Sequence, residues 1–186
     1  MAADDKQVML VDEEDRDLGL YPKLLAHQEG VLHRAFSVFV FNSKRQLLLQ
    51  KRADTKYHSP KLWSNTCCSH PLLKQNIEKE AQKRLEEEMG FTCPVSFCFK
   101  FIYKVQIDEL IEYEMDHVYV GFYDGLVLPH EEEVSDYKYI SLDELDKDLK
   151  QHPELYTAWF KICYSQLKDY YNVLIQYKGS AVKTLI

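Results

Sequence analysis

The sequence predicts an α+β domain in which a mixed β-sheet is flanked by helices. Apolar, β-prone segments outnumber helical ones, and the two kinds occur in mixed order along the chain. No internal repeat or low-complexity linker divides the 186 residues, of which 46% are hydrophobic, so the chain can bury one core. We therefore expect a single domain over residues 1–186, with its core at about 8–175.

Three apolar runs in the first third of the chain predict strands, at residues 8–11, 35–41 and 47–51. An acidic turn follows the first strand at 12–17. The segment 42–45 (NSKR) separates the second strand from the third, and this spacing is typical of a β-hairpin.

The central segment 75–89 predicts a helix, because apolar residues recur every four positions and charges lie between them. Gly90 follows at the position that a helix C-cap favours. Two β-rich segments come next, at 97–105 and 112–123, joined by a short acidic turn.

The last third of the chain predicts a short strand at 137–140 and two helices. Ser141 and Glu144 form a capping box, which opens a helix that runs to about Lys150. Apolar residues spaced from Leu155 to Leu174 then predict a long C-terminal helix.

Charge and cysteine content exclude several classes of protein. The formal net charge of −7 argues against a nucleic-acid partner, because phosphate backbones bind basic surfaces. The N-terminal segment MAADDK has no apolar signal region, and no apolar run approaches membrane-spanning length. Five cysteines are an odd number, which favours reduced thiols. We expect a cytoplasmic protein without membrane insertion.

A cysteine, a histidine and two carboxylates form the most informative pattern. Cys68 stands two residues before His70, and Glu112 stands two residues before Glu114 in an expected strand. Side chains alternate along a strand, so the two glutamates point the same way and repel unless a cation or a shared proton intervenes. A solvated strand face is the plainer interpretation of this pair taken alone.

Histidines make a metal site a reasonable hypothesis. With Glu112 and Glu114, the imidazoles of His27, His33 and His70 could bind Mn²⁺, Mg²⁺ or Zn²⁺. A histidine taken singly is more often a surface or core residue. We expect that plainer role for the remaining four, which are His58, His117, His130 and His152.

The chemistry of the cysteines does not decide between Cys67 and Cys68, because either one could be a reactive thiol or a buried one. The spacing of Cys93 and Cys98 does not fit a structural zinc site, so we expect both to pack in the core, as does Cys163. We expect the acidic run 131–133 to be a solvated loop.

The helix at 75–89 overlays the Nudix box, G-x5-E-x7-R-E-U-x-E-E-x-G-U, in a degraded form. Glu87, Glu88, Gly90 and Phe91 match, whereas Ser69, Gln75 and the pair Lys83–Arg84 replace the expected residues. Losing two carboxylates weakens the case for hydrolysis. Arg84 lies one helical turn before Glu88, so it could pair with that carboxylate or contact phosphate.

Three further cations are candidate diphosphate ligands, because each lies near the proposed site in the sequence. They are Lys23, Arg52 and Lys56. Ordinary solvated side chains are the plainer interpretation of each.

Several of these segments together resemble type 1 isopentenyl-diphosphate Δ-isomerases. The resemblance is carried by Asn65–Pro71 (NTCCSHP), His33–Phe36 (HRAF), Glu112–Asp116 (EYEMD), Tyr103 and Trp159. It extends from about Val8 to beyond Trp159 and implies a Nudix-like fold.

The resemblance implies a role for each matching residue. Cys68 matches the catalytic thiol, Glu114 the catalytic carboxylate, Tyr103 its hydrogen-bond partner, and Trp159 the indole that faces a cationic intermediate. The implied metal ligands are His27, His33, His70, Glu112 and Glu114. Glu88 matches a ligand of a second, substrate-associated Mg²⁺. The implied diphosphate ligands are Lys23, Arg52, Lys56 and Arg84.

The activity implied is conversion of isopentenyl diphosphate to dimethylallyl diphosphate, a prenyl diphosphate substrate and product of isoprenoid biosynthesis. We favour Glu114 with Tyr103 as the protonating side and Cys68 as the deprotonating side. A Nudix-type diphosphate hydrolase is the alternative. A metal-binding or redox-sensing protein without turnover is a third hypothesis.

Overall fold

The computed structural model describes residues 6–56 and 58–177, except for the side chains of residues 75 and 171–177. These residues form an α+β fold with one nine-stranded mixed sheet. Its strands are β1 (Gln7–Val11), β2 (Asp17–Pro22), β3 (His33–Phe41), β4 (Gln46–Arg52), β5 (Trp63–Ser64), β6 (Cys67–Ser69), β7 (Val95–Ile107), β8 (Leu110–Phe122) and β9 (Val134–Ser141). Its helices are α1 (Lys23–Glu29), α2 (Ile77–Met89), α3 (Leu142–Gln151) and α4 (Ala158–Tyr177), with short 3₁₀ turns η1 (Lys74–Asn76) and η2 (Pro153–Leu155).

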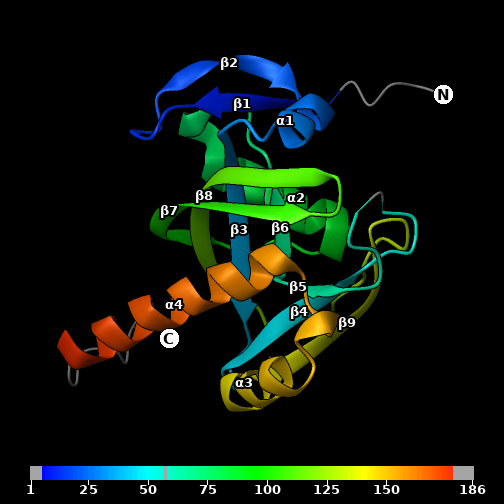
Figure 1. Ribbon diagram of the computed structural model, residues 1–186. Helices are drawn as coiled ribbons and strands as arrows, with labels where there is room; N and C mark the ends of the chain where they lie inside the picture. The colour runs from blue at the N-terminus through cyan, green and yellow to red at the C-terminus, as the bar shows by residue number, and fades with distance from the viewer. Residues whose placement is uncertain (1–5, 57, 178–186) are drawn as a thin grey trace.

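Strand β3 lies at the centre of the sheet. It pairs in parallel with β8 on one side and antiparallel with β6 on the other. Apolar side chains of β3 pack against α2 on one face and against α4 on the other, which forms two core clusters. Figure 1 shows α4 passing in front of the strands and α2 lying behind them. Side chains that alternate along β3 therefore enter two different environments.

The expected hairpin between β3 and β4 is confirmed only beside its turn. Val40 pairs with Leu48 and Phe41 with Leu47, but no further β3–β4 pairs form along the described strands. Strand β4 instead pairs with β9 and β5, while β3 pairs with β8 and β6. The two strands separate because each finds a longer partner elsewhere in the sheet.

The helix boundaries agree with the capping residues. Gly90 ends α2 in the left-handed region, with φ of 70°. A Cβ at Gly90 would lie 2.0 Å from the carbonyl oxygen of Leu128, so this position also requires glycine for close backbone approach. The capping box of Ser141 and Glu144 opens α3 as expected.

The C-terminal helix begins later than expected. Leu155 belongs to the 3₁₀ turn η2, and α4 starts at Ala158 after an extended Tyr156. The helix then runs to Tyr177, so Leu174 falls in it, although its side chain lies outside the described ones. Thr157 marks the observed start, because its hydroxyl accepts from the backbone N–H of Phe160 at 3.3 Å and so caps the first turn of α4.

Four short elements were not expected from the sequence, and two of them carry predicted site residues. Helix α1 has only seven residues, too few to show an apolar period, and β6 has three. Strands β2 and β5 were also missed. Within the described part of the chain, no helix is both long and apolar enough to cross a membrane.

Candidate active site

Three neighbouring strands place the predicted catalytic residues on one face of the sheet. In the parallel β3–β8 pair, His33 lies opposite Glu114. In the antiparallel β3–β6 pair, Ser37 lies opposite Cys68. Residues opposite each other share a face, and so do residues two apart on one strand, which brings Glu112 to the same side. Helix α4, with Trp159, covers this face.

The strand pairing separates the two adjacent cysteines that the sequence leaves open. Cys67 lies opposite Val38 and is buried in the core against α2. Cys68 faces the other way and lines a cavity. Only Cys68 can meet a ligand in that cavity, so the structure favours it as the reactive thiol.

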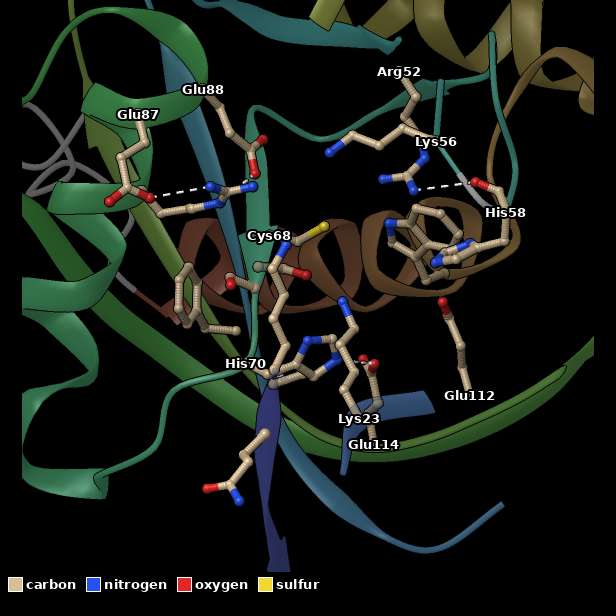
Figure 2. Close-up of a pocket in the computed structure, with 18 of the residues that line it drawn as sticks. Lys23, Arg52, Lys56, His58, Cys68, His70, Glu87, Glu88, Glu112 and Glu114 are labelled. Carbon is tan, nitrogen blue, oxygen red and sulfur yellow. Dashed lines mark hydrogen bonds and ion pairs between the residues drawn. The ribbon is translucent and has the colours of Figure 1, made fainter. Parts of the chain in front are cut away.

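The cavity has a volume of about 670 Å³. Figure 2 shows Cys68 near its centre, with Arg52 and Lys56 to one side and Glu88 to the other. Nearly all predicted site residues line it: Lys23, Arg52, Lys56, Cys68, His70, Arg84, Glu88, Tyr103, Glu112, Glu114 and Trp159. The two others, His27 and His33, are buried and lie beside Glu114.

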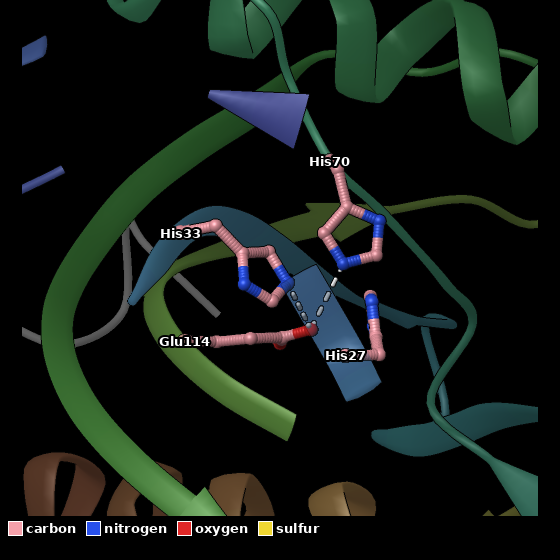
Figure 3. Close-up of side chains that lie close together, drawn as sticks. All are labelled: His27, His33, His70 and Glu114. Carbon is pink, nitrogen blue, oxygen red and sulfur yellow. Dashed lines mark hydrogen bonds and ion pairs between the residues drawn. The ribbon is translucent and has the colours of Figure 1, made fainter. Parts of the chain in front are cut away.

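Three imidazoles and one carboxylate form a cluster that could hold a metal ion. One ligand atom from each of His27, His33, His70 and Glu114 lies within 4.8 Å of the other three. Figure 3 shows the three rings gathered around the Glu114 carboxylate. Oε1 of Glu114 lies 2.9 Å from Nε2 of His70 and 3.6 Å from Nε2 of His33.

The imidazoles are held in the form that metals bind. Nδ1 of His27 lies 2.7 Å from the carbonyl oxygen of Lys23, and Nδ1 of His33 lies 2.8 Å from that of Val31. A carbonyl only accepts, so each Nδ1 carries the proton and each Nε2 presents its lone pair to the cluster. Among the described residues, Nε2 of His33 is buried and has no hydrogen-bond partner. The donor set therefore fits a divalent cation.

Burial keeps two of these ligands neutral. It lowers the pKa of His27, and it lowers the pKa of His70 to about 3 with help from the charge of Lys23. Neutral imidazole is the metal-binding form, so protons compete weakly at these positions.

A tyrosine hydroxyl joins the two predicted carboxylates. Tyr103 donates to Oε2 of Glu114 at 2.6 Å and lies 3.2 Å from Oε2 of Glu112. Burial and the charge of Glu114 raise the pKa of Glu112 well above its usual range. Burial opposes ionisation of Glu114 too, but the adjacent imidazoles of His33 and His70 hold its pKa well below that range. Glu112 lies outside the four-ligand cluster, and its role as a ligand stays a prediction.

Residues 31–160 match the NUDIX domain family. The chain is 46% identical over 167 residues to the isopentenyl-diphosphate Delta-isomerase of Pectobacterium atrosepticum, covering 89% of this chain and 93% of the relative. It is 49% identical to isopentenyl-diphosphate Delta-isomerase 2 of Photorhabdus laumondii, covering 84% and 89%. The chain belongs to the isopentenyl-diphosphate Delta-isomerase family. This confirms the family resemblance seen in the sequence.

Solved structures confirm the Nudix fold of this Delta-isomerase family member. DR0079 from Deinococcus radiodurans aligns with a TM-score of 0.64 at 16% identity, covering 79% of this chain and 90% of that one. A MutT protein from Methanosarcina mazei aligns with a TM-score of 0.59 at 15% identity, covering 74% and 94%. At such identities the likeness concerns the fold alone.

The degraded Nudix box of this Delta-isomerase family member forms an ion-paired cluster in α2. Nε of Arg84 lies 2.6 Å from Glu88, as one of the two sequence hypotheses expected, and Nη1 donates to Glu87 at 3.1 Å. Nη2 donates to Glu133 at 2.8 Å, and the same Glu133 oxygen pairs with Lys56. The sequence predicted a solvated loop at 131–133, and Glu131 and Glu132 are indeed exposed, but Glu133 is half-buried and ion-paired. It neutralises two of the predicted diphosphate ligands.

The Trp159 indole is held from three directions. Its Nε1 donates to Oγ of Ser64 at 3.0 Å, and the Arg52 guanidinium lies over the ring at 5.0 Å. The ring of His58 meets it edge-on at 5.5 Å. His58 was expected to be an ordinary surface or core histidine, but it lines the cavity. No local sequence pattern marks it, because only the loop after β4 brings it there.

Two remaining predictions concern Lys23 and the other cysteines. Lys23 is the first residue of α1 and lines the cavity, where burial lowers its pKa. Cys93 and Cys163 are buried in the core as expected. Cys98 is instead only half-buried on β7, where its thiol meets the Ser96 carbonyl at 3.7 Å.

Proposed function

We propose that this chain isomerises isopentenyl diphosphate to dimethylallyl diphosphate through Cys68 and Glu114, and thereby supplies isoprenoid biosynthesis. The observation that carries the proposal is the placement of these two side chains. They enter one cavity from strands that flank β3 on opposite sides. A bound alkene between them would meet one proton donor and one acceptor. The names of relatives more than 40% identical over most of their length support the same reaction.

The reaction needs one C–H bond formed and one broken. A proton added to the terminal alkene carbon gives a tertiary carbocation, and loss of a proton from the neighbouring carbon re-forms the double bond one position along. The sequence favours protonation by Glu114 with Tyr103 and deprotonation by Cys68. Burial, however, raises the pKa of Cys68 to about 12, and the pKa of Glu114 lies well below its usual range, which favours the Cys68 thiol as proton donor and the Glu114 carboxylate as acceptor. The short hydrogen bond from Tyr103 fixes the Glu114 carboxyl group that must face the substrate. The substrate as a whole gains and loses one proton.

We further propose that His27, His33, His70, Glu112 and Glu114 hold a Mn²⁺, Mg²⁺ or Zn²⁺ ion. Such a cation, when bound, tunes the acidity of the carboxylates it touches. The buried Nε2 atom of His33 supports its place among the ligands. Glu112, bridged to Glu114 by Tyr103, remains the predicted fifth ligand.

The cations of the cavity wall support a diphosphate substrate. Arg52, Lys56 and Lys23 line the same cavity as Cys68. Arg84 is already held by three carboxylates, so we propose that it reaches the diphosphate only as part of that cluster. Glu88 would offer a carboxylate to Mg²⁺ on the diphosphate.

The cationic intermediate needs stabilisation and protection from water. Trp159 is buried and lines the cavity, so its π face could stabilise a cation by about 2 kcal/mol or more. Burial of Tyr103 and Trp159 also limits the water that would capture the cation as an alcohol.

Diphosphate hydrolysis is the alternative that Glu87 and Glu88 keep open. The Nudix box has a glutamate where this chain has Arg84. The Arg84 guanidinium instead forms ion pairs with Glu87, Glu88 and Glu133. The arrangement therefore favours isomerisation.

Cytoplasmic location is also part of the proposal, and the five free cysteines support it because such thiols suit a reducing compartment.

The test is incubation of the purified protein with isopentenyl diphosphate and Mg²⁺ in deuterated water, followed by NMR. We expect dimethylallyl diphosphate that carries deuterium in the methyl group formed by protonation. Release of phosphate would favour the hydrolase, and metal binding without any turnover would favour a binding or redox-sensing protein. A Cys68→Ala variant run in parallel distinguishes this site from a contaminating enzyme.

A further inference from the structure

Two of the cations proposed for the diphosphate share one carboxylate that has no part in the chemistry described above. Oε2 of Glu133 accepts from Nη2 of Arg84 at 2.8 Å, and the same oxygen pairs with Nζ of Lys56. Both cations line the cavity that holds Cys68. The side chains of Lys56, Glu133 and Arg84 are only 21% to 24% exposed, so water screens their charges incompletely.

The backbone brings Lys56 and Glu133 together. Strand β4 pairs with β9 as far as Arg52 and Val134. The next amide, that of Ala53, donates to the carbonyl oxygen of Glu133 at 3.1 Å. The amide of Lys56 then donates to the carbonyl oxygen of Ala53 at 3.2 Å. The two side chains of the ion pair therefore start from backbone segments that are bonded to each other.

Glu133 is a negative charge held in a fixed place. Burial opposes its ionisation, but the hydrogen bond from Lys56 and the charge of Arg84 lower the pKa of Glu133. Arg84 is itself anchored on α2, where it lies 2.6 Å from Glu88 and 3.1 Å from Glu87. Lys56 lies on the loop after β4, so it is the partner of Glu133 that can turn toward a ligand.

Arg52 has a different kind of partner. Its Nε and Nη2 atoms donate to the backbone carbonyl oxygens of Ser59 and His58, both at 3.2 Å. A carbonyl oxygen positions a guanidinium without neutralising it, so the charge of Arg52 still attracts an anion. Lys56 must instead leave a carboxylate before it can bind one. The arriving anion then lies beside the uncovered charge of Glu133.

We propose that Glu133 makes this site select the magnesium complex of a diphosphate over the uncomplexed diphosphate. The inference rests on the proposed function, in which Lys56 binds the diphosphate of the substrate. An uncomplexed diphosphate carries several negative charges, so it is repelled by Glu133 once Lys56 has turned to it. Mg²⁺ on the diphosphate offsets that repulsion. Glu133 is thus a specificity-determining residue that acts against the wrong ligand.

Calorimetric titration of the purified holoenzyme with inorganic pyrophosphate tests the proposal. One titration contains Mg²⁺, and the other uses Mg²⁺-free buffer without a chelator, so that an ion at the histidine site stays bound. Glu133→Gln keeps the size of the side chain, and its amide oxygen can still accept from Arg84. This variant should bind Mg²⁺-free pyrophosphate roughly tenfold more tightly than wild type, and magnesium pyrophosphate within about threefold of wild type.

Two further variants show whether the ion pair itself is responsible. Glu131→Gln removes the same charge from an exposed side chain in the same turn. It should change neither affinity by more than about twofold, because salt screens an exposed charge. Lys56→Gln removes the cation that Glu133 holds. Adding Glu133→Gln to Lys56→Gln should therefore improve binding of Mg²⁺-free pyrophosphate less than Glu133→Gln does alone.

Each contrary result has its own meaning. Weaker binding of magnesium pyrophosphate by Glu133→Gln, with the Mg²⁺-free affinity unchanged, would make Glu133 a ligand of Mg²⁺ and overturn the proposal. Unchanged affinities in both titrations would reduce the ion pair to a structural role, and so would equal gains with and without Lys56. Wild-type protein that binds pyrophosphate in neither buffer would instead reject the diphosphate site of the proposed function.

Discussion

The hydroxyl of Tyr103 donates a 2.6 Å hydrogen bond to Oε2 of Glu114, across the antiparallel pair of β7 and β8. The two residues lie opposite each other in that pair, so the bond follows directly from strand register. Burial, then the charges of Glu112 and Glu114, raise the pKa of Tyr103 well above its usual range. Tyr103 therefore remains a donor and keeps the Glu114 carboxyl fixed.

Tyr103→Phe removes this donor without changing the size of the ring. We expect kcat to fall by roughly 10- to 100-fold, because the carboxyl that exchanges the proton loses its orientation. Metal content should stay at the wild-type level, since the imidazoles of the cluster are untouched. Steady-state kinetics and elemental analysis measure the two effects.

Tyr119→Phe is the matched control for that experiment. Tyr119 is also buried, but it belongs to the core cluster against α2, on the face away from the cavity. Its substitution should leave kcat unchanged. If Tyr103→Phe were as active as Tyr119→Phe, the tyrosine would have no catalytic part.

The adjacent cysteines offer a second experiment with a built-in control. Cys68→Ala should abolish detectable turnover while the protein still folds, because the thiol faces the cavity. Cys67→Ala should retain turnover and lower stability by about 1 kcal/mol, because it removes a buried group from the core. Turnover and thermal unfolding should thus separate the two neighbours. Substantial turnover in Cys68→Ala would reject its role.

Removal of metal should stop the reaction. Treatment with EDTA is expected to abolish turnover, and Mn²⁺, Mg²⁺ or Zn²⁺ added singly will identify which ion restores it. His33→Gln and His70→Gln should each weaken metal binding by at least about tenfold, since changes even outside the ligand set cost that much. His152→Gln is the control, because His152 is exposed near Glu154. Normal metal content in both cluster variants would contradict the site.

Local patterns in the sequence predicted the structural features that depend only on residues close together in the chain. Glu112 and Glu114 share a face because strand side chains alternate, and the Gly90 cap and the Ser141 capping box formed where expected. These features need only a few consecutive residues, so one sequence is sufficient to find them.

Long-range pairing decided what the sequence left open. Cys67 and Cys68 differ only in face, and that is set by β6 pairing with β3, about 30 residues earlier in the chain. Glu133 meets Arg84 across 49 residues. His27 lies on a seven-residue helix, which is too short for apolar periodicity to reveal. Such contacts arise from tertiary packing and leave no local signature.

A buried carboxylate on the turn between β1 and β2 should make stability depend on pH. Oδ1 of Asp15 accepts from Arg34 at 2.8 Å, and Oδ2 lies within 3.0 Å of both Lys74 and Lys100. Burial alone would raise its pKa, but the hydrogen bonds from these cations hold the pKa of Asp15 well below its ordinary value. The ionised form is therefore stabilised by folding.

The sign of the pH effect follows from that direction. A carboxyl with a depressed pKa in the folded state contributes fully above its unfolded pKa, which is about 4. Its contribution is lost as the pH falls below about 4. Asp15→Asn should lower the free energy of unfolding at pH 7 by about 2 to 3 kcal/mol. The loss should be smaller than for a fully buried ion pair, because the side chains of Lys74 and Lys100 are partly exposed to solvent.

Asp12→Asn is the control from the same turn. Asp12 pairs with the exposed Arg16, and an asparagine oxygen at this position can still accept from the same backbone N–H groups. Asp12→Asn should therefore lower the free energy of unfolding much less than Asp15→Asn does. Urea unfolding at pH 7 and at pH 3 gives the comparison. The difference in free energy of unfolding between wild type and Asp15→Asn should be smaller at pH 3, because part of the wild-type Asp15 is protonated there. A difference that is the same at both pH values would mean that the charge of Asp15 does not stabilise the turn.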